Sequence, residues 1–472
     1  MTKKILLALV VIALAAVPAF ASVQNIKVGG SIDSTYLVRD QFSLITEGDN
    51  QNLFLTQTTL RVDADLSENV SATVALLNER VWGEEAQTAE DNDIDLNLAF
   101  VTLREMLYSP LTVVVGRQSF AYGNSFIVDS GGTNNNISGA SGLSGVAEDL
   151  TLRTAQDAVR LIFDYNPLTV ELLASKIDSN INVTTGAQND DVNLLGTNLN
   201  YKLGDSWDSV VESYFFARID RSTGIDGSTD GLKADTLYVP GLRASTNPIK
   251  GLNVQGEVAG QFGNKATTHT AGTARVDNQD RGALGAQLIT NYMLPFEQLA
   301  KWSPVVTGVY TYTTGDKNPD YTGAQSDDYH GWDPLFENQA SGTVYNTLFD
   351  LTNSHIVMAS AQVNPIEDLT TKVTGTWLWL DKSVTDGTPG NNCFGTSCPF
   401  KMRQPNTAAG ISNPAVTTNK TIGYEVDVDL AYDYTEDVQI GLNMGWFTPG
   451  EFFTAANNEV ASQYLANVDV KF

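Results

Sequence analysis

The chain has 472 residues, and 28 Lys and Arg against 55 Asp and Glu give a formal net charge of −27. Such acidity argues against a nucleic-acid partner, because phosphate binding needs a basic surface. Two cysteines are too few for a disulfide framework, and a β-barrel can be this long as a single unit.

The first 21 residues have the pattern of a secretory signal peptide. Two lysines at positions 3 and 4 precede an apolar run, and Ala19-Phe20-Ala21 is a small-x-small cleavage site. We therefore expect a signal peptide at 1–21 and a mature chain at 22–472. After residue 21 no stretch reaches the ~20 apolar residues of a spanning helix. An exported chain of this kind is periplasmic, secreted or a β-barrel.

Eighteen segments of the mature chain have the length and alternation of β-strands. In 420–434, for example, Tyr424, Val426 and Val428 alternate with Glu425 and Asp427, which gives one apolar and one polar face. The predicted strands are 26–39, 52–66, 69–82, 93–106, 110–122, 156–166, 168–178, 190–203, 207–220, 235–247, 250–263, 281–294, 302–315, 351–364, 368–382, 420–434, 437–448 and 459–472.

The connections between these strands alternate between short and long. Short joins such as Asn166-Pro167 and Thr435-Glu436 alternate with long ones at 40–51, 83–92, 123–155, 179–189, 221–234, 264–280, 316–350, 383–419 and 449–458. Outer-membrane barrels have short periplasmic turns and long extracellular loops. The sequence thus predicts an all-β, antiparallel, up-and-down transmembrane barrel of about 18 strands in a bacterial outer membrane.

The three longest loops are 129–147, 316–350 and 383–419. Loops beyond roughly 15 residues are usually functional or disordered. We expect at least one of them to fold over or into the pore; the alternative is that they only form the exposed surface.

The last predicted strand ends on an aromatic residue. Tyr464, Val468, Val470 and Phe472 share its apolar face, and a terminal aromatic at the membrane interface is typical of such barrels. These residues also resemble the C-terminal signature that the bacterial barrel-assembly machinery reads. We expect that machinery, through Phe472, and outer-membrane lipid as partners.

Alternation also predicts which charged residues line the lumen, where they would set selectivity. The bases are Arg61, Arg117, Arg160, Arg218 and Arg243, and the acids are Asp63, Asp65, Asp164, Glu212, Glu257, Glu425, Asp427 and Asp429. The strand that carries Arg117 is apolar on both faces at 111–118, so its orientation is open. Each residue could instead be a solvated wall residue that pairs across strands. The excess of acids favours modest cation selectivity.

Two loop features raise the question of a disulfide or a metal. Cys393 and Cys398 lie in one loop of an exported protein, which favours a small disulfide over two free thiols. Clustered carboxylates suit calcium, although no spacing matches an EF-hand; they are Asp226, Asp230, Asp316, Asp320, Asp327 and Asp328. Solvated acidic loops are the alternative, and we expect no cofactor.

Signals of catalysis are missing from the sequence. It contains no GxSxG, HExxH, Walker loop or Rossmann fingerprint. We therefore expect no enzyme; a dispersed Ser/His/Asp site is the alternative.

Short motifs occur in a fixed order along residues 26 to 472. They include Gly116-Arg117-Gln118, Val159-Arg160-Leu161, Gln261-Phe262-Gly263, Trp332-Asp333-Pro334-Leu335-Phe336 and Pro449-Gly450. Their order resembles that of the alginate-export family of outer-membrane channels. The resemblance implies an eighteen-stranded barrel in which Arg117, Arg160 and Arg243 accompany the passage of an anionic polysaccharide. The acidic lumen departs from that family, as does Ala158, where its usual pattern has Gly.

Three functions fit these patterns. We favour a porin-like outer-membrane channel for diffusion or transport of small hydrophilic solutes. A dedicated exporter of an anionic polysaccharide such as alginate would need a continuous basic path through the lumen. A structural or adhesive outer-membrane protein, plugged by its loops, would show no conductance.

Overall fold

The computed structural model of the chain describes part of the sequence. The described residues are 25–44, 50–83, 94–129, 147–153, 155–179, 191–221, 234–271, 273–316, 328–339, 341–383 and 416–472. For residues 148 and 267–278 only the backbone is described. The predicted signal peptide at 1–21 lies outside the described residues.

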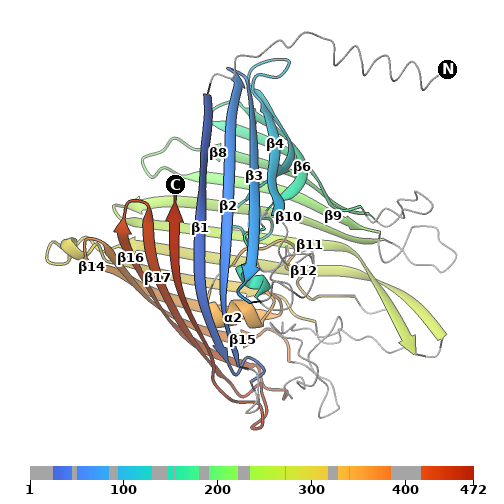
Figure 1. Cartoon of the computed structure of the whole chain (residues 1–472). Helices are drawn as coiled ribbons and strands as arrows, with labels where there is room; N and C mark the ends of the chain where they lie inside the picture. Colours follow the sequence, from blue (N-terminus) through green and yellow to red (C-terminus); the bar gives the residue numbers. More distant parts are fainter. Residues whose placement is uncertain are drawn as a thin grey trace.

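Eighteen antiparallel strands form one closed sheet (Figure 1). Each strand pairs with the next in the chain, and β18 pairs with β1, so the sheet closes on itself. This confirms the predicted all-β, up-and-down barrel. The strands are β1 (Asn25–Asp40), β2 (Gln51–Ser67), β3 (Val70–Val81), β4 (Ile94–Leu103), β5 (Leu111–Gln118), β6 (Gln156–Asp164), β7 (Leu168–Asp178), β8 (Val192–Lys202), β9 (Val210–Asp220), β10 (Asp235–Ile249), β11 (Leu252–Ala271), β12 (Thr273–Met293), β13 (Val305–Thr313), β14 (Ser354–Ile366), β15 (Leu369–Leu380), β16 (Thr421–Thr435), β17 (Val438–Pro449) and β18 (Ala461–Lys471).

The wall presents apolar side chains outward and polar side chains inward. In β16, Tyr424 and Val426 are exposed on the outer face, whereas Glu425 and Asp427 point inward and are buried. Strand alternation separates these two sets. Because the inward carboxylates are buried inside a polar lumen, other segments of the chain must cover them.

One predicted loop is part of two strands instead. Residues 264–280 were expected to form a long connection, but β11 runs to Ala271 and β12 begins at Thr273, with the two strands paired throughout. The sequence there is rich in Thr and polar residues and has no apolar face. Apolar alternation therefore gave no signal for this hairpin, although backbone hydrogen bonds hold it.

Within the described residues, three connecting segments lie inside the barrel. The first inward segment is 119–129, after β5. The second is 147–153, before β6, and contains the 3-10 helix η1 (Glu148–Leu150). The third is 328–353 without residue 340, and contains the helix α2 (Thr343–Leu348). The expectation that a long loop folds into the pore is confirmed for the described part of the loop at 316–350, which begins at residue 328.

The first and third inward segments pack on each other. Phe126 stacks on Trp332 with ring centroids 5.5 Å apart. The amide of Asp129 donates to the carbonyl oxygen of Phe336 at 2.8 Å, and the Phe336 amide donates to that of Ile127 at 3.1 Å. Aromatic stacking and backbone pairing thus join two loops into one body within the lumen.

Helices are a minor part of the fold. The helix α2 packs against β16, β17 and β18 inside the wall (Figure 1). The 3-10 helix η2 (Ala300–Trp302) belongs to the β12–β13 connection. Among the described residues, none of the helices has the length and apolar character needed to cross a bilayer.

Candidate functional site

The first inward segment is held by two carboxylates of the wall. The amides of Gly123 and Asn124 donate to Glu212 Oε1 at 2.9 Å and to Glu257 Oε2 at 2.7 Å. Tyr214 Oη donates to Glu257 Oε1 at 2.6 Å. Gly123 has φ +62°, and a Cβ there would lie 2.6 Å from Glu257 Oε1, so glycine permits this approach. Glu257 is only 3% exposed, which makes it an anchor and not an open lining residue.

Arg243 completes this anchor from β10. Its Nε donates to Asn124 Oδ1 at 2.5 Å and its Nη2 donates to Gln255 Oε1 at 2.9 Å. Its Nη1 lies 3.5 Å from Glu212 Oε2. The guanidinium therefore positions the first inward segment and offsets one carboxylate, because buried charges require partners.

Arg160 forms a second lumen ion pair near the same segment. Its Nε and Nη2 donate to Glu171 Oε1 and Oε2 at 2.5 Å and 3.0 Å. Tyr122 Oη also donates to Glu171. Burial, followed by the charge of Glu171, raises the pKa of Tyr122 well above its usual value. The phenol thus keeps the proton that it donates.

An ion cluster holds the third inward segment against β9–β12. Arg218 Nη2 lies 2.7 Å from Asp333 Oδ2, and Arg281 Nη2 lies 2.8 Å from Asp235 Oδ2. Gln261 Nε2 donates to the carbonyl oxygen of Asp333 at 2.6 Å, and the Asp333 amide donates to Gln261 Oε1 at 2.9 Å. Burial alone would raise the pKa of Asp333, but the charges of Arg218 and Arg281 outweigh it and hold that pKa well below its usual range.

Glu425 and Asp427 accept hydrogen bonds from the first backbone amides of α2. The amides of Val344 and Tyr345 donate to Glu425 Oε1 and Oε2 at 2.7 Å and 2.6 Å. The Thr343 amide donates to Asp427 Oδ1 over a longer 3.4 Å. Carboxylates suit these positions, because the first amides of a helix have no partners within it.

The second inward segment has anchors that the sequence analysis missed. Thr151 Oγ1 donates to Glu79 Oε2 at 2.7 Å, and Arg39 Nη2 donates to Asp149 Oδ2 at 2.5 Å. Glu79 shares its strand face with polar Ser71 and Thr73, so alternation could have found it. Glu171, Asp235 and Arg281 were missed in the same way, although each lies at an inward position of a predicted strand.

Near the short-turn end, the charged lumen residues are more open. Arg61 Nε lies 2.8 Å from Asp63 Oδ2, and their side chains are 49% and 40% exposed. Asp63 Oδ1 also accepts a hydrogen bond from Thr73 Oγ1 at 2.6 Å. Asp65 and Asp164 lie at the same end of their strands, close to the turns. This end of the lumen has charges that water can reach.

Arg117 departs from the predicted lumen set. It pairs across the ladder with Asp157, and its Nη1 lies 3.3 Å from Asp157 Oδ2. Alternation places it on the face of Val115 and Val159, which are exposed on the outside of the wall. The expected lumen placement is therefore corrected: 111–118 is apolar on both faces, so its pattern could not orient the strand.

Some predicted sites lie outside the described residues. These are Cys393 and Cys398, and, among the acidic loop residues, Asp226, Asp230, Asp320 and Asp327. Within the ranges that the structure describes, no group of three or more His, Cys, Asp or Glu side chains is arranged to hold a metal ion. The disulfide and the calcium alternative stay predictions.

The lumen charges have a common arrangement. Each of three lumen arginines has a carboxylate partner: Arg160, Arg218 and Arg243. A backbone amide of an inward segment donates a hydrogen bond to each of four wall carboxylates, which are Glu212, Glu257, Glu425 and Asp427. The structure therefore brings most of the predicted residues together at three docking points. Chemically, these groups hold the inward segments that narrow the lumen.

Comparison with known families and structures agrees with this geometry. Residues 24–467 match the family described as alginate export. No curated protein sequence matches the chain.

Solved structures with a similar fold come from Pseudomonas aeruginosa and Acinetobacter baumannii. Pseudomonas aeruginosa OccK2 (OpdF) in complex with glucuronate is 12% identical, with a TM-score of 0.53, covering 95% of this chain and 98% of that chain. Acinetobacter baumannii OccAB1 is 10% identical, with a TM-score of 0.54, covering 97% and 98%. Pseudomonas aeruginosa OprD is 12% identical, with a TM-score of 0.51, covering 95% and 96%. At this identity the likeness concerns the fold.

Proposed function

Because the chain belongs to the alginate export family, we propose that it is a porin-like channel of the bacterial outer membrane through which small hydrophilic solutes pass. The observation that carries the proposal is a closed eighteen-stranded wall around a polar lumen narrowed by three docked segments. A barrel of this size encloses an aqueous channel. Membrane lipid surrounds the wall, and the solute contacts the lumen.

Export of an anionic polysaccharide such as alginate is the second candidate, and the family description favours it. The OccK2 structure, solved with glucuronate, adds a precedent for a sugar acid in this fold. The paired arginines weigh against a continuous basic path. Arg160 is paired with Glu171, and Arg243 with Glu212. We therefore place diffusion or transport of small solutes first.

Further elements belong to the proposal. The first 21 residues direct export, and Phe472 presents the assembly signal to the barrel-assembly machinery. Cys393 and Cys398 form a loop disulfide. The channel needs no cofactor and catalyses no reaction, with calcium in the acidic loops kept as the alternative.

Liposome swelling tests the proposal. Purified protein is placed in vesicles, which are then diluted into solutions of uncharged sugars of increasing size. We expect swelling with monosaccharides that slows as the sugar becomes larger, because the inward segments narrow the passage. Vesicles that do not swell with any sugar would favour a structural or adhesive protein instead.

A further inference from the structure

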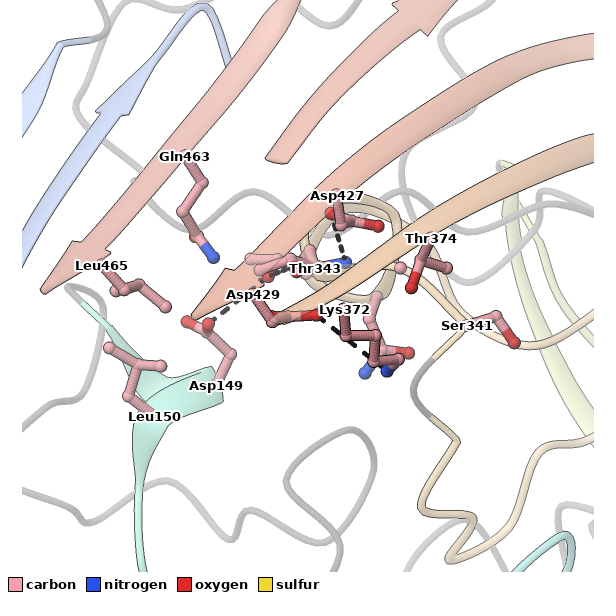
Figure 2. A pocket seen from close by; sticks show the side chains of 13 residues that line it. Asp149, Leu150, Ser341, Thr343, Lys372, Thr374, Asp427, Asp429, Gln463 and Leu465 are labelled. Carbon is pink, nitrogen blue, oxygen red and sulfur yellow. Dashed lines mark hydrogen bonds and ion pairs between the residues drawn. The ribbon is translucent and has the colours of Figure 1, made fainter. Parts of the chain in front are cut away.

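A pocket in the lumen lies between β15, β16, β18, α2 and the second inward segment (Figure 2). Its volume is about 270 Å³, close to the lower end of the roughly 300–1,000 Å³ of small-ligand sites. Figure 2 shows Thr374, Asp427, Lys372 and Asp429 on one side of it and Asp149 on the other. All the lining side chains belong to described residues.

Two buried oxygen atoms in the pocket wall have no hydrogen-bond partner within the part of the chain that the structure describes. They are Thr374 Oγ1 and Asp427 Oδ2, on side chains that are 4% and 2% exposed. The two residues are direct cross-strand partners on β15 and β16, so the two oxygens lie close together on one wall. Buried polar atoms without partners are costly, and here a solute could supply the hydrogen bonds.

Of the three carboxylates that line the pocket, two have a cation beside them and one does not. Asp149 Oδ2 is paired with Arg39 Nη2 at 2.5 Å. Asp429 Oδ2 lies 4.0 Å from Lys372 Nζ, its cross-strand partner. Asp427, alone among the carboxylates that line the pocket, has no cation among the described residues. Glu425 beside it, which has none either, binds α2 with both oxygens. A positive charge in the pocket would offset the charge of Asp427, whereas an anion would add to the uncompensated negative charge.

We propose that this pocket is a binding subsite for hydrophilic solutes of about monosaccharide size that carry one ammonium group. The ammonium lies against Asp427, the Thr374 hydroxyl bonds a neighbouring polar atom, and Lys372 and Asp429 contact hydroxyl groups of the solute. This inference rests on the proposed channel function and adds a preferred class of solute to it.

Three sugars of nearly the same size but different charge test how the charge of the solute affects binding. Glucosamine, glucose and glucuronate are titrated into the detergent-purified, folded full-length protein, and heat is measured. We expect glucosamine to bind most tightly and glucuronate least tightly. Asp427→Asn is expected to raise the Kd for glucosamine about tenfold, because one charge-assisted hydrogen bond is lost. The Kd for glucose should stay nearly unchanged.

Two further variants separate this site from general effects. Thr374→Val, which keeps the side-chain shape, is expected to weaken the binding of both glucosamine and glucose severalfold. Asp157→Asn removes a carboxylate from the outer face and should change nothing. The proposal is overturned if glucuronate binds as tightly as glucosamine, if no sugar binds, or if Asp427→Asn and Asp157→Asn have the same effect. A failure of the channel function itself would appear in liposome swelling, not in this binding series.

Discussion

The amide of Asn124 donates to Glu257 Oε2 at 2.7 Å, across 133 positions of the chain. This contact joins the first inward segment to the middle of β11. In the same way, the amides of Val344 and Tyr345 in the third inward segment donate hydrogen bonds to Glu425. Carboxylates that would line an open pore instead hold the segments that narrow it, so the size and the charge of the passage depend on the same residues.

Replacing Glu257 by Gln should loosen the first inward segment. A glutamine has the same shape, but it offers one acceptor where the carboxylate has two, and both are used. Leaving a buried partner unpaired costs about 1–3 kcal/mol. We expect a larger and noisier single-channel current. Glu436→Gln, in a short turn, is the matched control. Identical currents for wild type and Glu257→Gln would contradict the anchor.

The lowered pKa of Asp333 predicts how acid affects the third inward segment. Its pKa is lowered in the folded protein, so its stabilisation is fully present above the unfolded pKa of about 3.9 and is lost as the pH falls through the folded value. Between pH 8 and about 5, the current noise should therefore not change through this group. Asp333→Asn should show the loosened state already at pH 7, because Arg218 and Arg281 then share only Asp235. A wild-type transition above about pH 5 that Asp333→Asn removes would contradict this assignment.

Phe472 is expected to matter for assembly. Its amide donates to the Gly30 carbonyl oxygen at 3.0 Å, and the Gly30 amide donates back at 2.8 Å, where β18 meets β1. A side chain at Gly30 would contact the Phe472 ring, so the aromatic packs directly on this seam. We expect Phe472→Ala to lower the amount of folded protein in the outer membrane severalfold. Phe296→Ala, an exposed aromatic in a short connection, is the control.

The readout is the fraction of protein whose gel migration changes on boiling, measured in outer-membrane fractions. After refolding in detergent, Phe472→Ala should show the same heat-modifiable band as wild type, because the backbone bonds to Gly30 remain. Equal amounts of folded protein for the two variants in cells would argue against an assembly signal at Phe472.

The strands could be predicted from the sequence because lipid and water impose opposite requirements on their two faces. The outward Tyr424 and the inward Glu425 follow directly from that rule. Around Val113 and Val114 both faces are apolar, so the rule predicts a strand but not which of its faces points into the lumen. For this reason the prediction that Arg117 lies in the lumen is wrong. Where neither face is apolar, as in 264–280, the rule gave no strand at all.

The docking of the inward segments could not be predicted from the sequence. Asn124 and Glu257, or Asp333 and Arg218, are distant in the chain, and no local pattern relates a loop amide to a strand carboxylate. Alternation placed Glu212, Glu257 and Glu425 in the lumen, but could not distinguish a free wall charge from one that holds a loop. That distinction depends on three-dimensional packing.

The measurement that tests the account most directly is the reversal potential of single channels in a salt gradient across a planar bilayer. The acids of the lumen outnumber its bases, although many are paired, so we predict stepwise conductance with modest cation selectivity. Arg117→Ala should leave this selectivity unchanged, because Arg117 lies on the outer face. A clear anion preference that Arg243→Ala abolishes would contradict the account and favour export of an anionic polysaccharide.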